Sequence, residues 1–390
     1  MDSFYLRLVE GGYNNVLTNK CFKCTYIYFS NDCIESDFLY DCRNCLNCFG
    51  CVNLRNKSYC FFNEQLTKEE YVIKRKQIDL GKRSEVKITH QRFWELVKSQ
   101  PIRAVRIKQS NNSTGSDIEN CRDTFWSFQT EDSENIRYGR FTTAIKDSMD
   151  FGFSGKSNQL YETVQAGGDS SKVKFAYFSK TCLDCEYVFS CQNCSNCFGC
   201  VGLKNVKYAI FNKVYQPDDY FRIIDDLKEK LLKQGIYGEF FPYNFSNFAY
   251  NNSTAQILYP LSQEEILAKG GLWQDEIKAN IGESQTILSE DLPDNIDDVS
   301  DEILSKIIIS EQSGHPFRIV PKELEFYRRF RIALPVLTPL ERMIKRFETM
   351  SNLQIFEDQC FSCQKKIWSV HATQDGFRPY CESCYQQEIV

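Results

Sequence analysis

Histidine, methionine and tryptophan are scarce in this chain: its 390 residues include three His, four Met and four Trp. So few histidines leave little scope for imidazole-based catalysis, and no spacing suggests a Ser-His-Asp triad. Phosphate-binding loops are also missing, because neither GxxxxGK[ST] nor a strand-bound GxGxxG motif occurs. We therefore predict that the protein is not an enzyme.

Long apolar runs are absent as well. No window approaches 18 apolar residues, and the first 15 residues, MDSFYLRLVEGGYNN, lack the basic region and apolar core of an export signal. We expect a cytoplasmic protein with no membrane partner. The odd number of cysteines, 19, in a chain of this length then favours reduced thiols or metal thiolates over disulfides.

One cysteine pattern occurs twice. DCRNCLNCFGC, residues 41–51, returns as SCQNCSNCFGC, residues 190–200, and a shift of 149 residues also aligns much of the surrounding sequence. The two runs place cysteines at strict three-residue intervals: Cys42, Cys45, Cys48 and Cys51, then Cys191, Cys194, Cys197 and Cys200. This self-similarity predicts that one structural unit is present in two copies.

Segments of alternating apolar or aromatic residues follow polar pairs at intervals of roughly 10 to 15 residues, which is typical of short strands and turns. We expect this alternation, with its period of two, to place one set of side chains inward. Thirty Phe and 21 Tyr also favour a β-rich interior. We predict a mainly β protein with helical insertions, in which a β-solenoid-like duplicated body precedes a C-terminal zinc ribbon. A sandwich topology remains an alternative.

Three interpretations of the cysteine runs stay open. In the first, each cysteine is a small inward residue that follows an Asn at a corner, as in Asn44-Cys45 and Asn193-Cys194. In the second, the runs bind zinc. In the third, they bind an iron–sulfur cluster, although the ferredoxin ending x3-C-Pro is replaced by Gly50-Cys51 and its counterpart.

Composition and helix signals divide the chain into seven predicted segments. Two capping boxes, at Thr67 to Glu70 and Ser262 to Glu265, and a Pro at position 217 mark helix starts. The predicted segments are 1–66, a first Cys-rich repeat; 67–110, a basic helical insertion; 111–215, solenoid-like coils with the second Cys-rich repeat; 216–282, helical and irregular; 283–302, an acidic linker; 303–350, a basic helical region; and 351–390, a zinc ribbon.

Positive charge is concentrated in two stretches of a chain with a net charge of -5. Residues 74–108 carry 11 Lys or Arg against three acids, and residues 315–346 carry eight against three. Such stretches are either solvated helix faces or phosphate-binding surfaces. The predicted nucleic-acid-binding residues are Lys82, Arg83, Lys87, Arg92, Arg103, Arg106, Arg328, Arg329 and Arg331.

The C-terminal sequence predicts a metal site. Cys360, Cys363, Cys381 and Cys384 form C-x2-C-x17-C-x2-C, the spacing of a structural Zn²⁺ site with four thiolates. Because protein ligands would fill all four positions, no water nucleophile could bind. We expect the metal to fold this tail rather than to catalyse a reaction.

Several segments resemble an uncharacterised family of zinc-ribbon proteins from environmental and candidate-phylum bacteria: NCFGCVNLRNKSYCFFNEQLTKEEY, AYNNSTAQILYPLSQEEILAKGGLWQDE, SGHPFRIVPKELEFYRRFRIALPVLTP and the final ribbon. The resemblance implies zinc and a similar architecture, but no established activity. It also implies a second ribbon whose cysteine positions are occupied here by Ser310, Thr338 and Glu341. This chain would then lack one zinc and hold that region by packing.

These observations favour a non-enzymatic, zinc-containing binding protein that engages structured RNA or a ribonucleoprotein through its basic helical elements and zinc ribbon. A protein-interaction scaffold is the alternative, and a redox or iron–sulfur protein is a third possibility that rests on the cysteine runs alone.

Overall fold

The protein is described by a computed structural model that covers residues 1–275, 285–350 and 353–389. It forms two compact units. The first contains the described residues of Met1–Ala104, Asp275–Asn352 and Glu357–Val390, and the second contains Val105–Gln274 and Leu353–Phe356. The predicted boundary at residues 282 and 283 lies outside the described residues, as do residues 351, 352 and 390 of the predicted ribbon.

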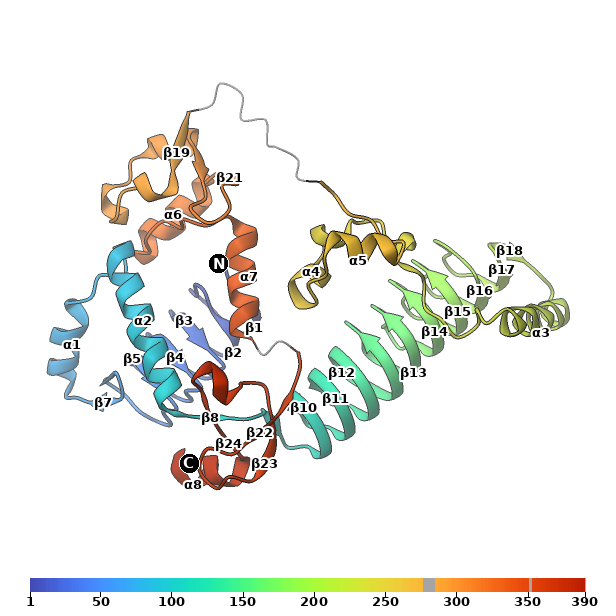
Figure 1. The fold of residues 1–390 in the computed structure, drawn as a ribbon, viewed down its shortest axis with the longest axis horizontal. Coiled ribbons are helices and arrows are strands. Elements are labelled where there is room, and N and C mark those ends of the chain that lie inside the picture. Colours follow the sequence, from blue (N-terminus) through green and yellow to red (C-terminus); the bar gives the residue numbers. More distant parts are fainter. Residues whose placement is uncertain (276–284, 351–352, 390) are drawn as a thin grey trace. The chain divides into compact units, whose positions relative to one another are not determined.

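The first unit begins with a seven-stranded sheet in which the strands lie in chain order (Figure 1). Neighbouring strands are parallel except for the last pair, and paired residues such as Ile27 and Leu39 are twelve positions apart. The strands are β1 (Phe4–Arg7), β2 (Val16–Asn19), β3 (Thr25–Tyr28), β4 (Asp37–Tyr40), β5 (Phe49–Val52), β6 (Cys60–Phe61) and β7 (Glu64–Gln65).

A three-residue conformational repeat builds this sheet. From Asn14 to Phe62, every third residue has φ between 46° and 67°. The left-handed conformation turns the chain, and Asn tolerates it better than most residues because its side chain bonds locally. Most of the residues that directly follow these positions are buried, although Lys57 after Asn56 is exposed. The expected strand alternation with a period of two is therefore wrong; the period is three, and four repeats separate paired strands.

Small side chains, mostly Cys and Ser, make up much of the buried core beside this sheet. Ser30 is fully buried: its hydroxyl donates to the carbonyl of Tyr28 at 2.9 Å and accepts from the N–H of Cys42 at 3.0 Å. Cys51 is equally buried, and its Sγ donates to the carbonyl of Phe49 at 3.2 Å and accepts from the N–H of Asn63 at 3.5 Å. Thiols and hydroxyls thus satisfy the same backbone groups.

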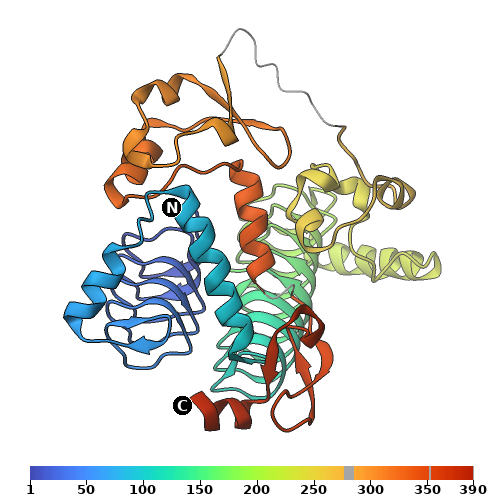
Figure 2. The same ribbon diagram turned by 60° about the vertical axis from the view of Figure 1, so that its left-hand side comes forward.

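Two helices follow this sheet, α1 (Lys68–Lys76) and α2 (Arg83–Ser99). The capping box between Thr67 and Glu70 is confirmed at the start of α1. Helix α2 lies along the sheet (Figure 2). Its fully buried Phe93 contacts Tyr28 and Phe38, with ring centroids 6.1 and 5.7 Å apart. Phe93 is therefore part of the core of the first unit.

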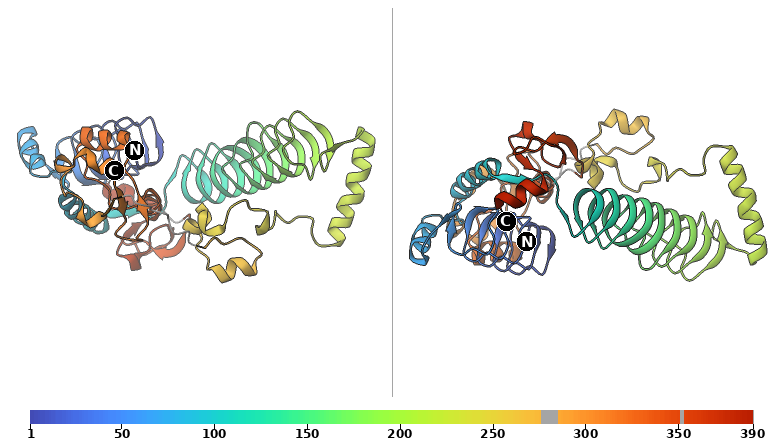
Figure 3. Two further views of the ribbon diagram at one scale, coloured as in Figure 1. Left: turned by 90° about the horizontal axis from the view of Figure 1, so that it is seen from above. Right: turned by 90° about the horizontal axis from the view of Figure 1, so that it is seen from below.

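The second unit contains a ten-stranded sheet, which is a regular stack of strands with helix α3 (Pro217–Lys233) at its end (Figure 3). Paired residues are mostly twelve apart, and thirteen apart between β13 and β14. The strands are β9 (Ile107–Lys108), β10 (Asn111–Glu119), β11 (Arg122–Glu131), β12 (Glu134–Gly152), β13 (Gly155–Val164), β14 (Ser171–Tyr177), β15 (Leu183–Phe189), β16 (Ser195–Phe198), β17 (Lys207–Ile210) and β18 (Lys213–Val214).

Both sheets end in the same way. Asn63 and Asn212, which are 149 residues apart, each bond through the side chain to the backbone of a valine eleven residues earlier, Val52 or Val201. A short antiparallel strand follows each Asn, β7 or β18, and a helix comes next. These endings leave no long parallel edge strand exposed, which limits edge-to-edge association.

The second unit continues with short helical elements, and the capping box at Ser262 and Glu265 is confirmed. They are η1 (Tyr243–Phe245), η2 (Tyr250–Asn252), α4 (Thr254–Leu258) and α5 (Gln263–Ala268). The chain then returns to the first unit with β19 (Thr286–Leu288), η3 (Ser289–Asp291), η4 (Ile296–Asp298), η5 (Asp301–Ser305), β20 (Ile307–Ile309), β21 (Pro316–Phe317), α6 (Pro321–Phe330) and α7 (Pro339–Thr349).

The acidic segment expected to be a linker is packed where it is described. Leu292, Ile296 and Ile303 are buried between its acids. The carboxylate of Asp294 accepts hydrogen bonds from the backbone N–H and the hydroxyl of Ser84, at 2.9 and 2.6 Å, at the start of α2. The many acidic and turn-forming residues of this segment obscured the spacing of its apolar residues in the sequence. Among the described residues, no helix is long and apolar enough to cross a membrane.

Candidate metal centre and nucleic-acid interface

The last described residues form a small ribbon with four cysteines at one end. Its elements are β8 (Pro101–Arg103), β22 (Phe356–Gln359), β23 (Lys366–Ser369), η6 (Thr373–Asp375), β24 (Arg378–Tyr380) and α8 (Glu382–Ile389). Cys360 and Cys363 lie in the turn after β22, whereas Cys381 and Cys384 lie at the start of α8. Their four Sγ atoms are all within 4.8 Å of one another.

This geometry fits a tetrahedral ion. Metal–sulfur bonds of about 2.3 Å imply neighbouring sulfurs about 3.8 Å apart, and the Sγ atoms of Cys363 and Cys381 are 3.8 Å apart. A hydrogen bond with the Ser383 hydroxyl lowers the pKa of Cys381 to about 6. A hydrogen bond between Cys384 and Cys381 raises the pKa of Cys384 to about 12. A cation among the four sulfurs would favour the deprotonated form of each of them. The quartet can therefore hold a metal ion.

A buried polar network fixes the ribbon to the first sheet within the first unit. The hydroxyl of Tyr385 in α8 donates to Asp41 at 2.9 Å and lies 2.8 Å from Oδ1 of Asn53. Arg103 in β8 lies over the Tyr385 ring at 4.3 Å and forms ion pairs with Asp41 and Glu382. Strand β24 also pairs in parallel with β8. A metal ion held by the quartet would therefore organise a segment that is part of a larger core.

A second hairpin in the first unit has the same backbone hydrogen bonds but no thiols. The N–H of Gly314 donates to the carbonyl of Ser310 at 3.0 Å, as the N–H of Gln364 donates to the carbonyl of Cys360 at 2.9 Å. The two hairpins are thus built alike at their turns.

Hydrogen bonds to the Glu341 carboxylate connect the second hairpin to the start of helix α7. Glu341 Oε2 accepts from the Ser310 hydroxyl at 2.7 Å and from the Thr338 N–H at 2.7 Å, and all three residues are buried. Burial would raise the pKa of Glu341, but hydrogen bonds from Ser313, Ser310 and Thr338 outweigh it and lower the pKa. The resemblance led us to expect that packing, in place of a metal, holds this region. The structure shows that hydrogen bonds to the buried Glu341 carboxylate also connect its parts.

The cysteines of the two runs are all buried inside the sheets. Asn44 and Asn193 have the left-handed conformation, and the following Cys45 and Cys194 point inward. Cys45 Sγ donates to carbonyls at 3.4 and 3.7 Å, and Cys194 Sγ donates to the equivalent carbonyls at 3.3 and 3.4 Å. Burial raises the pKa of Cys191 to about 11. Across the part of the chain that the structure describes, the C-terminal quartet alone meets the spacing for a shared ion. These contacts favour the packing interpretation.

The structure does not gather the predicted basic residues on one surface. Arg106 lies in the second unit and the other eight in the first. Six of the nine make internal polar contacts with acids or backbone carbonyls: Lys82 with Glu85, Arg83 with Leu292, Arg103 with Asp41 and Glu382, Arg106 with Asp117, Arg328 with Asp301, and Arg331 with Asp79 and Asp297. Arg92 lies over the Phe62 ring at 3.7 Å. Lys87 and Arg329 are exposed without an ion pair to another described residue.

A groove in the first unit brings the two basic stretches together. We call it the basic groove; it has a volume of about 1140 Å³. Five Lys or Arg and three Asp or Glu line it, which leaves a local balance of +2. Its lining is Glu10, Gly11, Phe22, Lys23, Thr25, Asp37, Arg75, Lys76, Ile78, Asp79, Leu80, Phe326, Arg329, Phe330, Arg331 and Ile332. The sequence predictions missed Lys23, Arg75 and Lys76, because no sequence pattern links them to Arg329.

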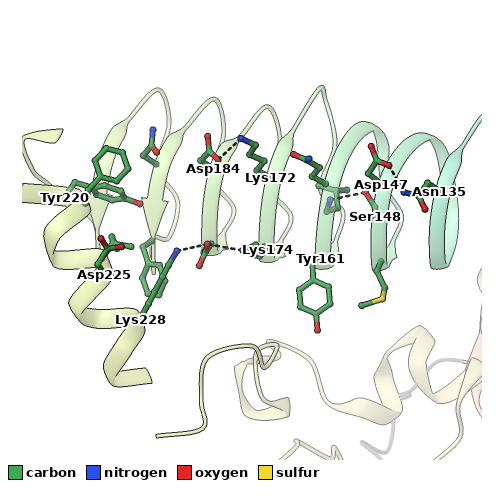
Figure 4. Close-up of a pocket in the computed structure, with 18 of the residues that line it drawn as sticks. Asn135, Asp147, Ser148, Tyr161, Lys172, Lys174, Asp184, Tyr220, Asp225 and Lys228 are labelled. Carbon is green, nitrogen blue, oxygen red and sulfur yellow. Dashed lines mark hydrogen bonds and ion pairs between the residues drawn. The ribbon is translucent and has the colours of Figure 1, made fainter. Parts of the chain in front are cut away.

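A second groove, in the second unit, is electrically neutral. It has a volume of about 870 Å³ and lies on the face of the ten-stranded sheet beside α3 (Figure 4). Rows of paired side chains cross it: Asn135 donates to Asp147 at 2.7 Å, and Lys174 and Lys228 lie 3.6 and 2.8 Å from Glu186. Four acids and four bases line this neutral groove. It therefore offers no net attraction to a polyanion.

Comparisons with known proteins supply no family. No family model matches the chain, and no curated protein matches it. Among solved structures, a putative acetyltransferase from Desulfovibrio desulfuricans G20 is 9% identical, with 53% of this chain and 51% of that chain covered and a TM-score of 0.11. The chain thus spans about half of that protein's length. A similarity this low carries no argument about fold or activity.

Proposed function

We propose that this protein is a non-enzymatic, metal-containing RNA-binding protein that holds RNA in the basic groove. One observation carries the proposal: the two basic stretches, far apart in the sequence, meet there, since Arg75 and Lys76 of one and Arg329 and Arg331 of the other line the same groove. Lysine and arginine side chains that converge on a groove neutralise phosphates and give salt-dependent affinity. Of the nine residues predicted to bind nucleic acid, Arg329 and Arg331 line this groove.

We infer further that the metal is zinc and that both sheets are β-solenoids descended from one duplicated unit. Four sulfur ligands without an open position suit structural zinc, although an iron–sulfur cluster uses the same ligands. The twelve-residue register and the equivalent Cys and Asn bonds 149 residues apart support the duplication. Unoxidised buried thiols and the structural metal suit a reducing compartment, so we place the protein in the cytoplasm. Membership of the zinc-ribbon family stays part of this proposal.

The neutral groove favours a second candidate function, a protein-interaction scaffold. Lys172 is paired with Asp184, and Lys174 and Lys228 are paired with Glu186. The exposed Phe221 of α3 also lines the groove. Aromatic residues beside satisfied polar groups are common in protein interfaces. This second function requires no RNA.

Fluorescence anisotropy with a labelled hairpin RNA that carries a single-stranded loop tests the main proposal. We expect binding at 50 mM salt that weakens steeply by 200 mM, because bound phosphates release counterions. If the purified protein did not bind the hairpin at 50 mM salt, RNA binding would be rejected and the scaffold would become the better account.

A further inference from the structure

The basic groove combines an apolar floor with cationic walls. Phe326 and Phe330 of α6 have ring centroids 4.6 Å apart, and both contribute to the floor. Phe22 of the first sheet is 36% exposed, so its ring is accessible to a ligand, and the ammonium of Lys23 lies 5.0 Å from the ring centroid. A ligand that fits this floor must present flat or apolar groups.

Two of the groove's cations are free to meet an anion. Arg75 is held by Asp37 at 3.0 Å, and Arg331 is held by Asp79 at 2.8 Å, so these pairs form a rigid framework. Lys76 and Arg329 are exposed and pair with no acid among the described residues. The basic groove is therefore lined by two ion-paired arginines and by two cations that are available to bind an anion.

From this arrangement we infer that the basic groove selects single-stranded RNA, a refinement that rests on the proposed function. Unpaired bases stack on the ring of Phe22 and on the Phe326–Phe330 floor, while Lys76 and Arg329 bind the phosphates that flank the stacked bases. Stacking on aromatic side chains with phosphate contacts alongside is the usual means of holding single strands. In a duplex the bases are already stacked on each other, so duplex RNA meets only the cations.

The test uses the whole protein and two probes: a 5′-labelled 12-nucleotide oligouridylate and a 12-base-pair RNA duplex. We expect the single strand to bind at least tenfold more tightly than the duplex. Phe22→Leu keeps an apolar side chain but removes the ring, so it should weaken single-strand binding about tenfold and leave the salt slope unchanged.

Substituting Lys76 and Arg329, unlike Phe22→Leu, should change the salt dependence of RNA binding. Lys76→Gln with Arg329→Gln should lower the slope of log affinity against log salt by about 1.4, since each phosphate contact to a single strand contributes about 0.7. Lys57→Gln is the matched control, because Lys57 is also exposed and pairs with no acid among the described residues but lies outside the groove. It should leave affinity and slope unchanged. Unchanged metal content in every variant confirms that each one is folded.

The outcomes separate this inference from the proposed function. If neither probe nor the hairpin RNA binds, the proposed function fails. If the duplex binds as tightly as the single strand, or if Phe22→Leu has no effect, RNA binding stands but single-strand selection is overturned. An equal loss with Lys57→Gln would place the RNA site outside the basic groove and overturn the inference as well.

Discussion

The phenolic oxygen of Tyr385 donates a hydrogen bond to Oδ2 of Asp41 across 2.9 Å, which joins the last helix of the chain to a corner of its first sheet. Asp41 has a φ of 46° and marks one of the repeated left-handed positions of that sheet. Tyr385 directly follows Cys384 in α8. Cys381 and Cys384 of the quartet therefore lie in the same short segment as the docking contact, so loss of the metal should disturb that contact.

Replacing one metal ligand should release the ribbon. Because metal binding and folding of such a site are coupled, we expect Cys381→Ser to lose the metal and to unfold the last ~30 residues. Hydrogen exchange should then become faster in the ribbon and around Asp41 but not in the ten-stranded sheet. Cys197→Ala, which changes a buried thiol in that sheet, is the control and should keep the metal. A Cys381→Ser protein with a protected ribbon would refute the coupling.

Removing the docking hydroxyl should weaken the attachment without emptying the metal site. Tyr385→Phe leaves the buried Asp41 carboxylate without one donor, which should cost about 1–3 kcal/mol of unfolding free energy. Denaturant titration measures this cost, and elemental analysis should find the metal content unchanged. Stability equal to the wild type would show that water replaces the lost hydroxyl at no cost.

The buried thiols of the sheets should behave as small core groups. Cys45→Ala and Cys194→Ala each remove one sulfur and its weak hydrogen bonds, so each should cost roughly 1 kcal/mol. Because the two positions have equivalent contacts, the two costs should be similar. A much larger loss, accompanied by loss of metal, would indicate that the runs are metal sites.

Acid should weaken the region around Glu341. Its folded-state pKa is lowered by hydrogen bonds, so its contribution to stability is present above the pKa of the unfolded state, about 4.3, and is lost as the pH falls through the lower folded pKa. Glu341→Gln should be less stable than the wild type at pH 7, and the gap should shrink below pH 4. Denaturant titrations of both proteins across this pH range measure the gap. A gap that is constant with pH would exclude a charged hub.

The sequence predicts those features that depend on neighbouring residues. The helix caps at Thr67 and Ser262 and the C-terminal quartet were found because each is a local motif with a fixed spacing. The corner role of Asn44, with an inward cysteine after it, was also expected. The sequence did not predict the three-residue conformational repeat. Tyr26 and Phe38 also adopt the left-handed conformation, and aromatic residues do not indicate that conformation in a sequence.

The basic groove could not be predicted from the sequence because its residues meet only through the fold. Arg75 and Arg329 are 254 positions apart, and clusters of charge gave no sign of which cations become paired. Arg83 and Arg328 looked equally suitable in the sequence, but both are occupied by internal partners. Local charge thus identified the basic stretches but not the residues that remain available.

The metal content per chain, measured by elemental analysis of anaerobically purified protein, tests most directly the central claim that only the C-terminal quartet holds a metal while the other thiols pack the sheets. We predict one zinc per chain and no iron in the wild type, none in Cys381→Ser, and one in Cys45→Ala and Cys194→Ala. More than one zinc per chain, or iron together with absorbance near 400 nm, would contradict it.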